Sequence, residues 1–146
     1  MKKIALISVL VFVGFIFGQS VFLDYDDVEA DGGIQFYQGS FDEALALAKK
    51  ENKLIFMDSY ATWCGPCKRM SSEVFTKSSV GDLFNEKFIN VKMDMEKGRG
   101  PELARKYRIK YYPTLLFIKP DGKIKRKEAG FHSDSLLLDI ASKVLN

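Results

Sequence analysis

The sequence predicts an α/β fold in which a central mixed β-sheet is flanked by helices on both faces. Short apolar runs typical of buried strands alternate with segments whose apolar residues recur at helical spacing. Towards the end of the chain, two strand-like runs flank residues 120–123, Pro-Asp-Gly-Lys, a turn signal that predicts an antiparallel hairpin. Strand–helix–strand units followed by a hairpin and a final helix favour a mixed sheet over a purely parallel one.

Each element in the first half of the domain has its own local signal. Residues 34–37 are expected to form a short first strand. Ser40 and Glu43 form a capping box, which predicts a helix from there to about Asn52. Residues 54–61 are apolar enough for a buried central strand, and a helix is expected to begin at the cysteines that follow.

The second half continues the alternation of helices and strands. A short helical stretch over residues 79–86 precedes residues 88–94, whose alternating pattern suits a strand. Pro101 favours the first turn of a helix that continues through Tyr107. The remaining expected elements are a strand over 114–118, a returning strand over 124–129 and a last helix capped by Ser133.

The first 20 residues have the three-part layout of a secretory signal peptide. Two lysines follow Met1, an apolar run covers residues 4–18, and small residues precede a cut expected after Ser20. An uncleaved N-terminal anchor is the alternative, because Phe22 and Leu23 could extend the run towards the about 20 residues that a spanning helix needs.

Residues 21–33 carry five acidic side chains and end in two glycines, which predicts an acidic flexible arm. The folded domain is therefore expected over residues 34–146. The chain has 22 basic and 19 acidic residues, and loss of Lys2 and Lys3 with a signal peptide would lower its net charge from +3 to +1. This balance favours neither nucleic acid nor a strongly charged substrate, and a monomer is expected.

The two cysteines of the chain, Cys64 and Cys67, follow the predicted central strand directly. Unpaired N–H groups and the dipole at a helix start favour a thiolate on the first sulfur, and the second lies within disulfide reach. This is the geometry of a reversible dithiol/disulfide switch. One alternative is half of a zinc site, to which only the distant His132 could add a histidine ligand. Another is an inert structural disulfide, although so short a loop constrains the unfolded chain little.

Residues 63–68, Trp-Cys-Gly-Pro-Cys-Lys, resemble the signature of thioredoxins. Asp58 stands six residues before the first cysteine, where thioredoxins carry a buried acid. Tyr112-Pro113-Thr114 precedes an apolar strand, as the cis-proline segment of the family does, and Gly130 matches a family glycine. The resemblance implies the thioredoxin fold and a thiol–disulfide oxidoreductase that needs no metal or other cofactor.

The resemblance covers about residues 36–146. Residues 73–75, 85–88 and 130–131 are most similar to the C-terminal domain of DsbD-type thiol:disulfide interchange proteins and their small secreted relatives. The chain is thus identified as a member of the thioredoxin superfamily with a DsbD-like character.

Three residues are expected to carry the chemistry. Cys64 is the expected nucleophile, and the more shielded Cys67 would resolve the mixed disulfide by attacking Cys64. Asp58 would accept the proton of Cys67, because burial in an apolar strand raises the pKa of a carboxyl. The alternative for Asp58 is a strand-end acid exposed to water.

Four further side chains are expected to shape the site. Trp63 would pack beside the sulfurs and form part of the docking surface. The resemblance implies that Pro113 is cis and holds the Tyr112 backbone open to an extended substrate, the alternative being an ordinary trans proline. Lys92 either lies near the buried acid, as in many thioredoxins, or is a solvated strand lysine.

The expected function is the reduction of protein disulfides by an exported protein, periplasmic or otherwise extracytoplasmic. Gly65 and Pro66 form the dipeptide of reducing thioredoxins, and no histidine stands between the cysteines as in strong oxidants. The expected partners are disulfide-containing protein substrates and, because such compartments oxidise dithiols, an electron donor in the membrane. An oxidase or isomerase of secreted proteins is one alternative, and a thioredoxin-fold binding module without net turnover is another.

Overall fold

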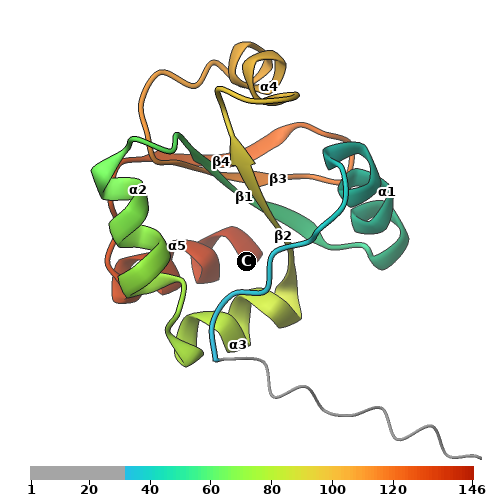
Figure 1. Cartoon of the computed structure of the whole chain (residues 1–146). Helices are drawn as coiled ribbons and strands as arrows, with labels where there is room; N and C mark the ends of the chain where they lie inside the picture. Colours follow the sequence, from blue (N-terminus) through green and yellow to red (C-terminus); the bar gives the residue numbers. More distant parts are fainter. Residues whose placement is uncertain (1–31) are drawn as a thin grey trace, which may run out of the picture.

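A computed structural model describes residues 32–146, in which helices cover both faces of a four-stranded sheet (Figure 1). The helices and strands, in chain order, are α1 Phe41–Glu51, β1 Leu54–Tyr60, α2 Gly65–Arg69, the π-helical turn η1 Met70–Val74, α3 Ser78–Lys87, β2 Phe88–Asp94, α4 Gly100–Lys106, β3 Thr114–Ile118, β4 Ile124–Ala129 and α5 Asp134–Leu145. The predicted signal peptide and most of the predicted acidic arm lie outside the described residues.

The sheet has the strand order β2-β1-β3-β4. β1 pairs in parallel with β2 and antiparallel with β3, and β3 pairs antiparallel with β4 through the predicted hairpin turn. The mixed sheet is therefore confirmed, and β1 is one of its two central strands. The loop after β1 leads into the two cysteines, so the most buried part of the sheet positions them.

Alternating side chains of the strands pack into two separate hydrophobic cores, one on each face of the sheet. Phe56 of β1 and Phe117 of β3 face α3 and α5 in one core, where Phe56 also packs edge-on against Phe84 at 4.7 Å between ring centroids. Ile55 and Leu116 face the other way, against α1 and α4. The ribbon shows the same two layers of helices on opposite sides of the sheet (Figure 1). This arrangement confirms the predicted fold class.

The local helix signals are mostly confirmed. Ser40 and Glu43 make the reciprocal capping box at the start of α1, and Asn52 ends that helix in the left-handed conformation. Ser133 caps α5 by accepting a hydrogen bond from the backbone N–H of Leu136. No helix within residues 32–146 is long and apolar enough to cross a membrane.

The prediction of a first strand over residues 34–37 is wrong. This segment runs beside β2, and the Tyr37 N–H donates to the carbonyl of Asn90. The other backbone N–H groups of the segment do not continue a β-ladder with β2. The Gln35 N–H donates to the Asn85 side chain, and the Ile34 N–H donates to a carbonyl of the loop after η1. Side-chain and loop acceptors thus replace the strand partners that an apolar pattern alone suggests.

The helix that begins at the cysteines contains a turn that the sequence did not predict. Over Met70–Val74 the helix widens to a π turn, and the Phe75 N–H donates to the Met70 carbonyl, five residues back, at 2.9 Å. π-helical turns are rare in proteins, and those that occur are often found at functional sites. In this turn Met70 and Val74 are buried, while Ser71 lies beside the sheet.

Candidate functional site

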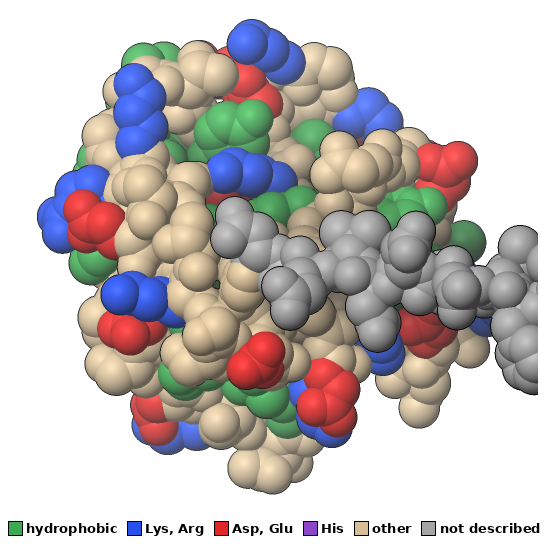
Figure 2. Space-filling view, turned by 60° about the horizontal axis from the view of Figure 1, so that its bottom comes forward, with side chains coloured by type: hydrophobic (Ala, Val, Ile, Leu, Met, Phe, Trp, Pro, Cys, Tyr) green, Lys and Arg blue, Asp and Glu red, His purple; other side chains and the backbone are tan. Residues whose placement is uncertain are grey.

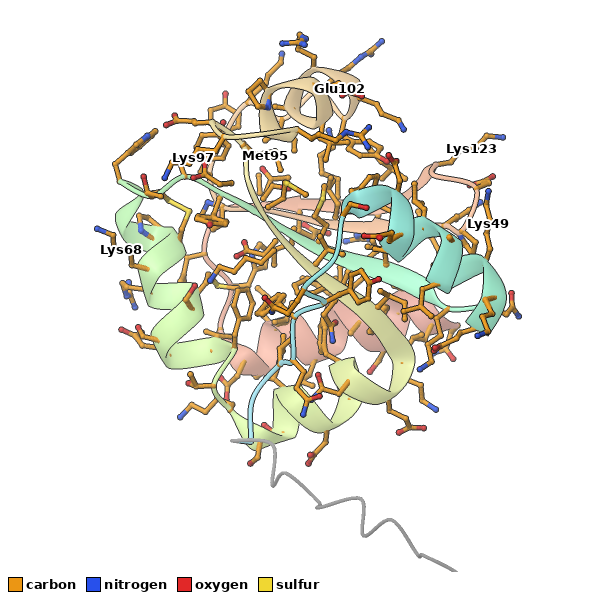
Figure 3. All side chains as sticks on the ribbon, turned by 45° about the vertical axis from the view of Figure 1, so that its right-hand side comes forward. Lys49, Lys68, Met95, Lys97, Glu102 and Lys123 are labelled. Atoms are coloured by element: carbon orange, nitrogen blue, oxygen red, sulfur yellow. A yellow bond between two sulfur atoms is a disulfide. The ribbon has the colours of Figure 1, made fainter. Side chains whose placement is uncertain are left out.

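The two cysteines form a disulfide at the start of α2, with their Cα atoms 5.3 Å apart. Cys64 is the N-cap residue, and its sulfur accepts a hydrogen bond from the Cys67 N–H at 3.2 Å. A donor aimed at this sulfur stabilises negative charge on it once the disulfide is reduced. Lys68, which follows Cys67, points away from the domain (Figure 3).

Exposure does not separate the two cysteines in this disulfide form, because each residue is 3% exposed. The expectation that Cys67 is more shielded than Cys64 is therefore not met here. Both sulfurs belong to a small apolar cluster with Ala61, against which Tyr60 and Tyr112 pack. The difference between the cysteines lies in their place on the helix: Cys64 caps its N-terminus and Cys67 lies inside its first turn.

An exposed aromatic side chain lies beside the disulfide. Trp63 is 66% exposed and packs edge-on against Tyr112, with 6.0 Å between the ring centroids. Glu96 lies in the loop after β2, and both of its carboxylate oxygens accept a hydrogen bond from the Trp63 indole N–H at 3.0 Å. This loop lies at the end of the sheet where α2 begins, between the labelled Met95 and Lys97 (Figure 3). Glu96 thus orients the exposed indole, and no sequence signal had singled it out.

The segment before β3 contacts the cysteine cluster through Tyr112. The peptide bond between Tyr112 and Pro113 is cis, as the resemblance implied. The Pro113 carbonyl accepts a hydrogen bond from the Gly130 N–H at 2.8 Å. Gly130 has φ of +94°, a conformation that L side chains rarely adopt, which explains the glycine at this position. Burial raises the pKa of the Tyr112 hydroxyl, and Glu96 and Asp94 raise it further.

Asp58 lies in the middle of β1 and is completely buried. Within residues 32–146 neither of its carboxylate oxygens has a hydrogen-bond partner. Burial raises the pKa of Asp58 to about 7, against an opposing effect of the nearby Lys92. The structure therefore does not place Asp58 as a water-exposed strand-end acid. This buried carboxyl, with its raised pKa, lies on the strand that leads to the two cysteines.

Lys92 is the register partner of Asp58 on β2, but its ammonium group bonds elsewhere. Lys92 Nζ donates to the Ser71 hydroxyl at 2.5 Å. It also lies 5.2 Å from the ring centroid of Tyr60, within cation–π range. Lys92 is half-buried, so it is not the freely solvated lysine of the alternative interpretation.

A pocket of about 310 Å³ opens beside Cys67. It is lined by Tyr60, Ala61, Thr62, Cys67, Lys68, Ser71 and Lys92. The pocket is large enough to hold water and has polar groups from three different elements. Cys67 and the Ser71–Lys92 pair therefore border the same pocket.

The family model described as Thioredoxin matches residues 34–142. The chain belongs to the thioredoxin family. Its fold, its disulfide in a Cys-x-x-Cys motif at Cys64 and Cys67 and its cis-proline segment agree with this family.

Individual relatives of this thioredoxin-family chain fall into two groups. Thioredoxin-1 of Drosophila melanogaster is 36% identical over 74 residues, which are 51% of the chain and 64% of the relative. Thiol:disulfide interchange protein DsbD 2 of Pseudomonas aeruginosa is 31% identical over 86 residues, 58% of the chain but 15% of the relative. The chain thus spans less than two thirds of the length of the fly thioredoxin and a small part of the DsbD protein.

A solved structure shows a higher identity. A protein of Bacteroides thetaiotaomicron, provisionally described as a disulphide isomerase, is 50% identical with a TM-score of 0.66. The alignment covers 74% of this chain and 90% of that one. Together with the DsbD similarity, it supports the predicted place of the chain among DsbD-like members of the thioredoxin superfamily.

The thioredoxin-family site brings together most of the residues that the sequence singled out. Cys64, Cys67, Trp63 and Tyr112 are in one cluster or in direct contact, and Lys92 lies beside Asp58 in the sheet register. Gly65 and Pro66 form the first turn of α2 between the cysteines. Sequence reasoning missed Ser71 and Glu96, since both act through partners more than 20 residues away.

Proposed function

We propose that this protein is an exported protein-disulfide reductase that cycles Cys64 and Cys67 between dithiol and disulfide. The observation that supports the proposal most directly is the Cys64–Cys67 disulfide at the start of α2. The buried Asp58 on the preceding strand, whose carboxylate oxygens have no hydrogen-bond partner within residues 32–146, adds a candidate proton acceptor. The exposed Trp63 and the Tyr112-Pro113 segment beside it provide a surface for an extended substrate.

The proposed cycle begins with the reduced protein. The Cys64 thiolate attacks one sulfur of a substrate disulfide, and the other substrate sulfur leaves as a thiolate that takes up a proton. Cys67 then loses its proton to the Asp58 carboxylate, directly or through water in the adjoining pocket. The Cys67 thiolate attacks the Cys64 sulfur, which forms the Cys64–Cys67 disulfide and releases the second substrate thiol. The substrate gains two electrons, so the protein needs an external electron donor before the next cycle.

The partners follow from this cycle. The substrates are disulfide-containing proteins, and in an oxidising compartment the donor is a reductase in the membrane. On the face that carries α3, acidic and basic side chains are interspersed, so this face does not favour substrates of one charge (Figure 2). The protein acts as a monomer in this proposal.

Isomerisation is the second candidate function. The observation that favours it is the 50% identity to the B. thetaiotaomicron structure described provisionally as a disulphide isomerase. An isomerase uses the same Cys64 attack but releases the substrate after the substrate's own thiols have rearranged. The reduction potential separates the two functions, because isomerases work near −180 mV and thioredoxin near −270 mV.

We expect the Cys64–Cys67 pair to have a reduction potential of roughly −230 to −280 mV. Neutral Gly65 and Pro66 add no cationic group that would stabilise the reduced thiolate, so the dithiol donates electrons readily. Equilibration in dithiothreitol buffers, monitored by Trp63 fluorescence, measures this value. A potential above about −180 mV would contradict the reductase assignment.

A second experiment, the reduction of insulin disulfides, tests whether the protein turns over a substrate. Wild type is expected to reduce insulin with dithiothreitol as the donor, and Cys64→Ser is expected to be inactive. If wild type bound insulin but turned over no faster than Cys64→Ser, the protein would be a binding module and not a reductase.

Export is the part of the proposal that depends on residues 1–20. We expect a mature protein that begins after Ser20 or Gly18, because the basic start, short apolar run and small residues suit a signal peptidase. N-terminal sequencing of the protein from the extracytoplasmic fraction measures this. Recovery of chains with Met1 in the membrane fraction would instead indicate an uncleaved anchor.

A further inference from the structure

The buried Asp58 and Lys92 sit side by side in the sheet without pairing. They are direct register partners on parallel strands, and their side chains lie on the face that α2, α3 and α5 cover. An unpartnered buried carboxylate is costly, and a lysine within reach would ordinarily bond to it. Neither Asp58 oxygen, however, has a hydrogen-bond partner within residues 32–146.

The Lys92 ammonium is instead held by Ser71. Ser71 lies in the first part of the π turn η1, and its hydroxyl accepts a hydrogen bond from Lys92 Nζ at 2.5 Å. Three ring centroids lie within 6 Å of the same Nζ atom: Tyr60 at 5.2 Å, Phe36 at 5.6 Å and Phe75 at 5.9 Å. The rings attract the cation from several sides but supply no strong acceptor, so Ser71 provides its only hydrogen bond to a side chain within residues 32–146.

The Ser71–Lys92 pair also borders the route to the second cysteine. Both side chains line the pocket of about 310 Å³ that Cys67 lines from α2. The titratable groups that face Asp58 or line this pocket are Lys92, Tyr60, Cys67 and Lys68. The neighbouring strand β3 places the apolar Leu115 opposite Asp58. Lys92 is therefore the cation whose position decides how strongly a positive charge acts on the Asp58 carboxyl.

We propose that Ser71 is a positioning residue that holds the Lys92 ammonium at the pocket wall, away from Asp58, and thereby preserves Asp58 as a proton acceptor for Cys67. The inference rests on the proposed thiol–disulfide cycle and adds a residue that controls its proton transfer. With Ser71 in place, the carboxyl keeps a high proton affinity and takes the Cys67 proton near neutral pH. A lysine bonded directly to Asp58 would stabilise the carboxylate and make it a weaker base.

The test is the titration of the Asp58 carboxyl in the oxidised full-length protein, followed by ¹³C NMR of the aspartate side chains. The cysteines do not titrate in the disulfide, so this readout is independent of turnover. Ser71→Ala should lower the Asp58 midpoint by about one pH unit, since an opposite charge at 4–6 Å has an effect of this size. Ser71→Thr, which keeps the hydroxyl, should restore the wild-type midpoint. Asp58→Asn assigns the signal.

Two further variants separate positioning from a general structural effect. In Lys92→Met the Asp58 midpoint should rise, and adding Ser71→Ala to Lys92→Met should have no further effect. Ser72→Ala is the matched control, because the Ser72 hydroxyl donates to the Lys68 carbonyl and does not touch Lys92. An unchanged midpoint in Ser71→Ala, or an equal shift with and without Lys92, would overturn the proposal. Failure of wild type to reduce insulin would overturn the proposed function alone, because the titration needs no substrate.

Discussion

Cys67→Ser should stop the protein at the mixed disulfide and lower insulin turnover by at least about a hundredfold. Cys67 lies one helical turn from Cys64, within bonding distance, and therefore attacks as an intramolecular group of high effective concentration. A serine hydroxyl at this position cannot displace the substrate thiol. The Cys64 thiolate can still attack, so a covalent adduct with the substrate should accumulate, and non-reducing gels with mass spectrometry measure it.

The matched control for the trap is Cys64→Ser, which keeps Cys67 but removes the sulfur at the helix N-terminus. It should form far less adduct than Cys67→Ser, and dithiothreitol should release whatever adduct forms. If Cys64→Ser trapped substrate as well as Cys67→Ser did, the roles of the two cysteines would be reversed. Because both cysteines are equally buried in the disulfide form, their roles are assigned from helix position and not from exposure.

Asp58→Asn should make the oxidised protein more stable above neutral pH while slowing the resolution of mixed disulfides. Burial raises the pKa of Asp58 from 3.8 in the unfolded chain to about 7 in the folded protein. Its contribution to stability is fully present below pH 3.8 and is lost as the pH rises through 7, since only the unfolded state ionises readily between these values. The full loss is at most about 4 kcal/mol.

Denaturant unfolding of the oxidised protein at several pH values measures this effect. Between pH 4 and pH 8 the free energy of unfolding of wild type should fall relative to that of Asp58→Asn. Asp139→Asn, which removes an exposed acid paired with Lys143 on α5, is the control and should follow wild type. Parallel pH profiles for wild type and Asp58→Asn would mean that the carboxyl does not titrate in this range.

The kinetic consequence has its own pH signature. Only the ionised Asp58 can accept the Cys67 proton, so the wild-type rate of resolution should rise as the pH passes through about 7. Asp58→Asn should lose that inflection and resolve roughly tenfold more slowly or worse near neutral pH. Stopped-flow measurement of substrate release across pH tests this. An unchanged rate profile would show that Asp58 has only a structural role.

The residues that carry the chemistry could be predicted because their signals are local. The Cys64–Cys67 spacing, the Ser40–Glu43 capping box and the turn at residues 120–123 each lie within a few positions of the chain. Backbone geometry links such neighbours directly, whatever the rest of the molecule does. The alternation of apolar runs likewise predicted the mixed sheet and the two layers of helices, since burial periodicity reports the class of element.

The sequence pattern predicted the wrong local structure in two places. Residues 34–37 alternate like a strand, but the Asn85 side chain and a loop carbonyl accept two of their N–H groups. The helix after the cysteines has no glycine or proline at residues 70–74 to mark a distortion, yet it widens there into a π turn. For residues 34–37, the competing acceptors lie far away in the sequence, where no local pattern includes them.

The sequence by itself determined that this chain is a thioredoxin-family protein with a Cys-x-x-Cys pair, because the motif and the signals for its helices and strands are encoded in short segments. Only the tertiary structure decided that Asp58 has no hydrogen-bond partner among residues 32–146, that Lys92 bonds to Ser71 21 residues away, and that Glu96 holds Trp63. The physical reason is that a hydrogen bond of a side chain depends on which acceptor is nearest in space. Lys92 stands opposite Asp58 in the sheet register, yet its ammonium group donates to Ser71 of η1, and no short stretch of sequence contains both Lys92 and Ser71.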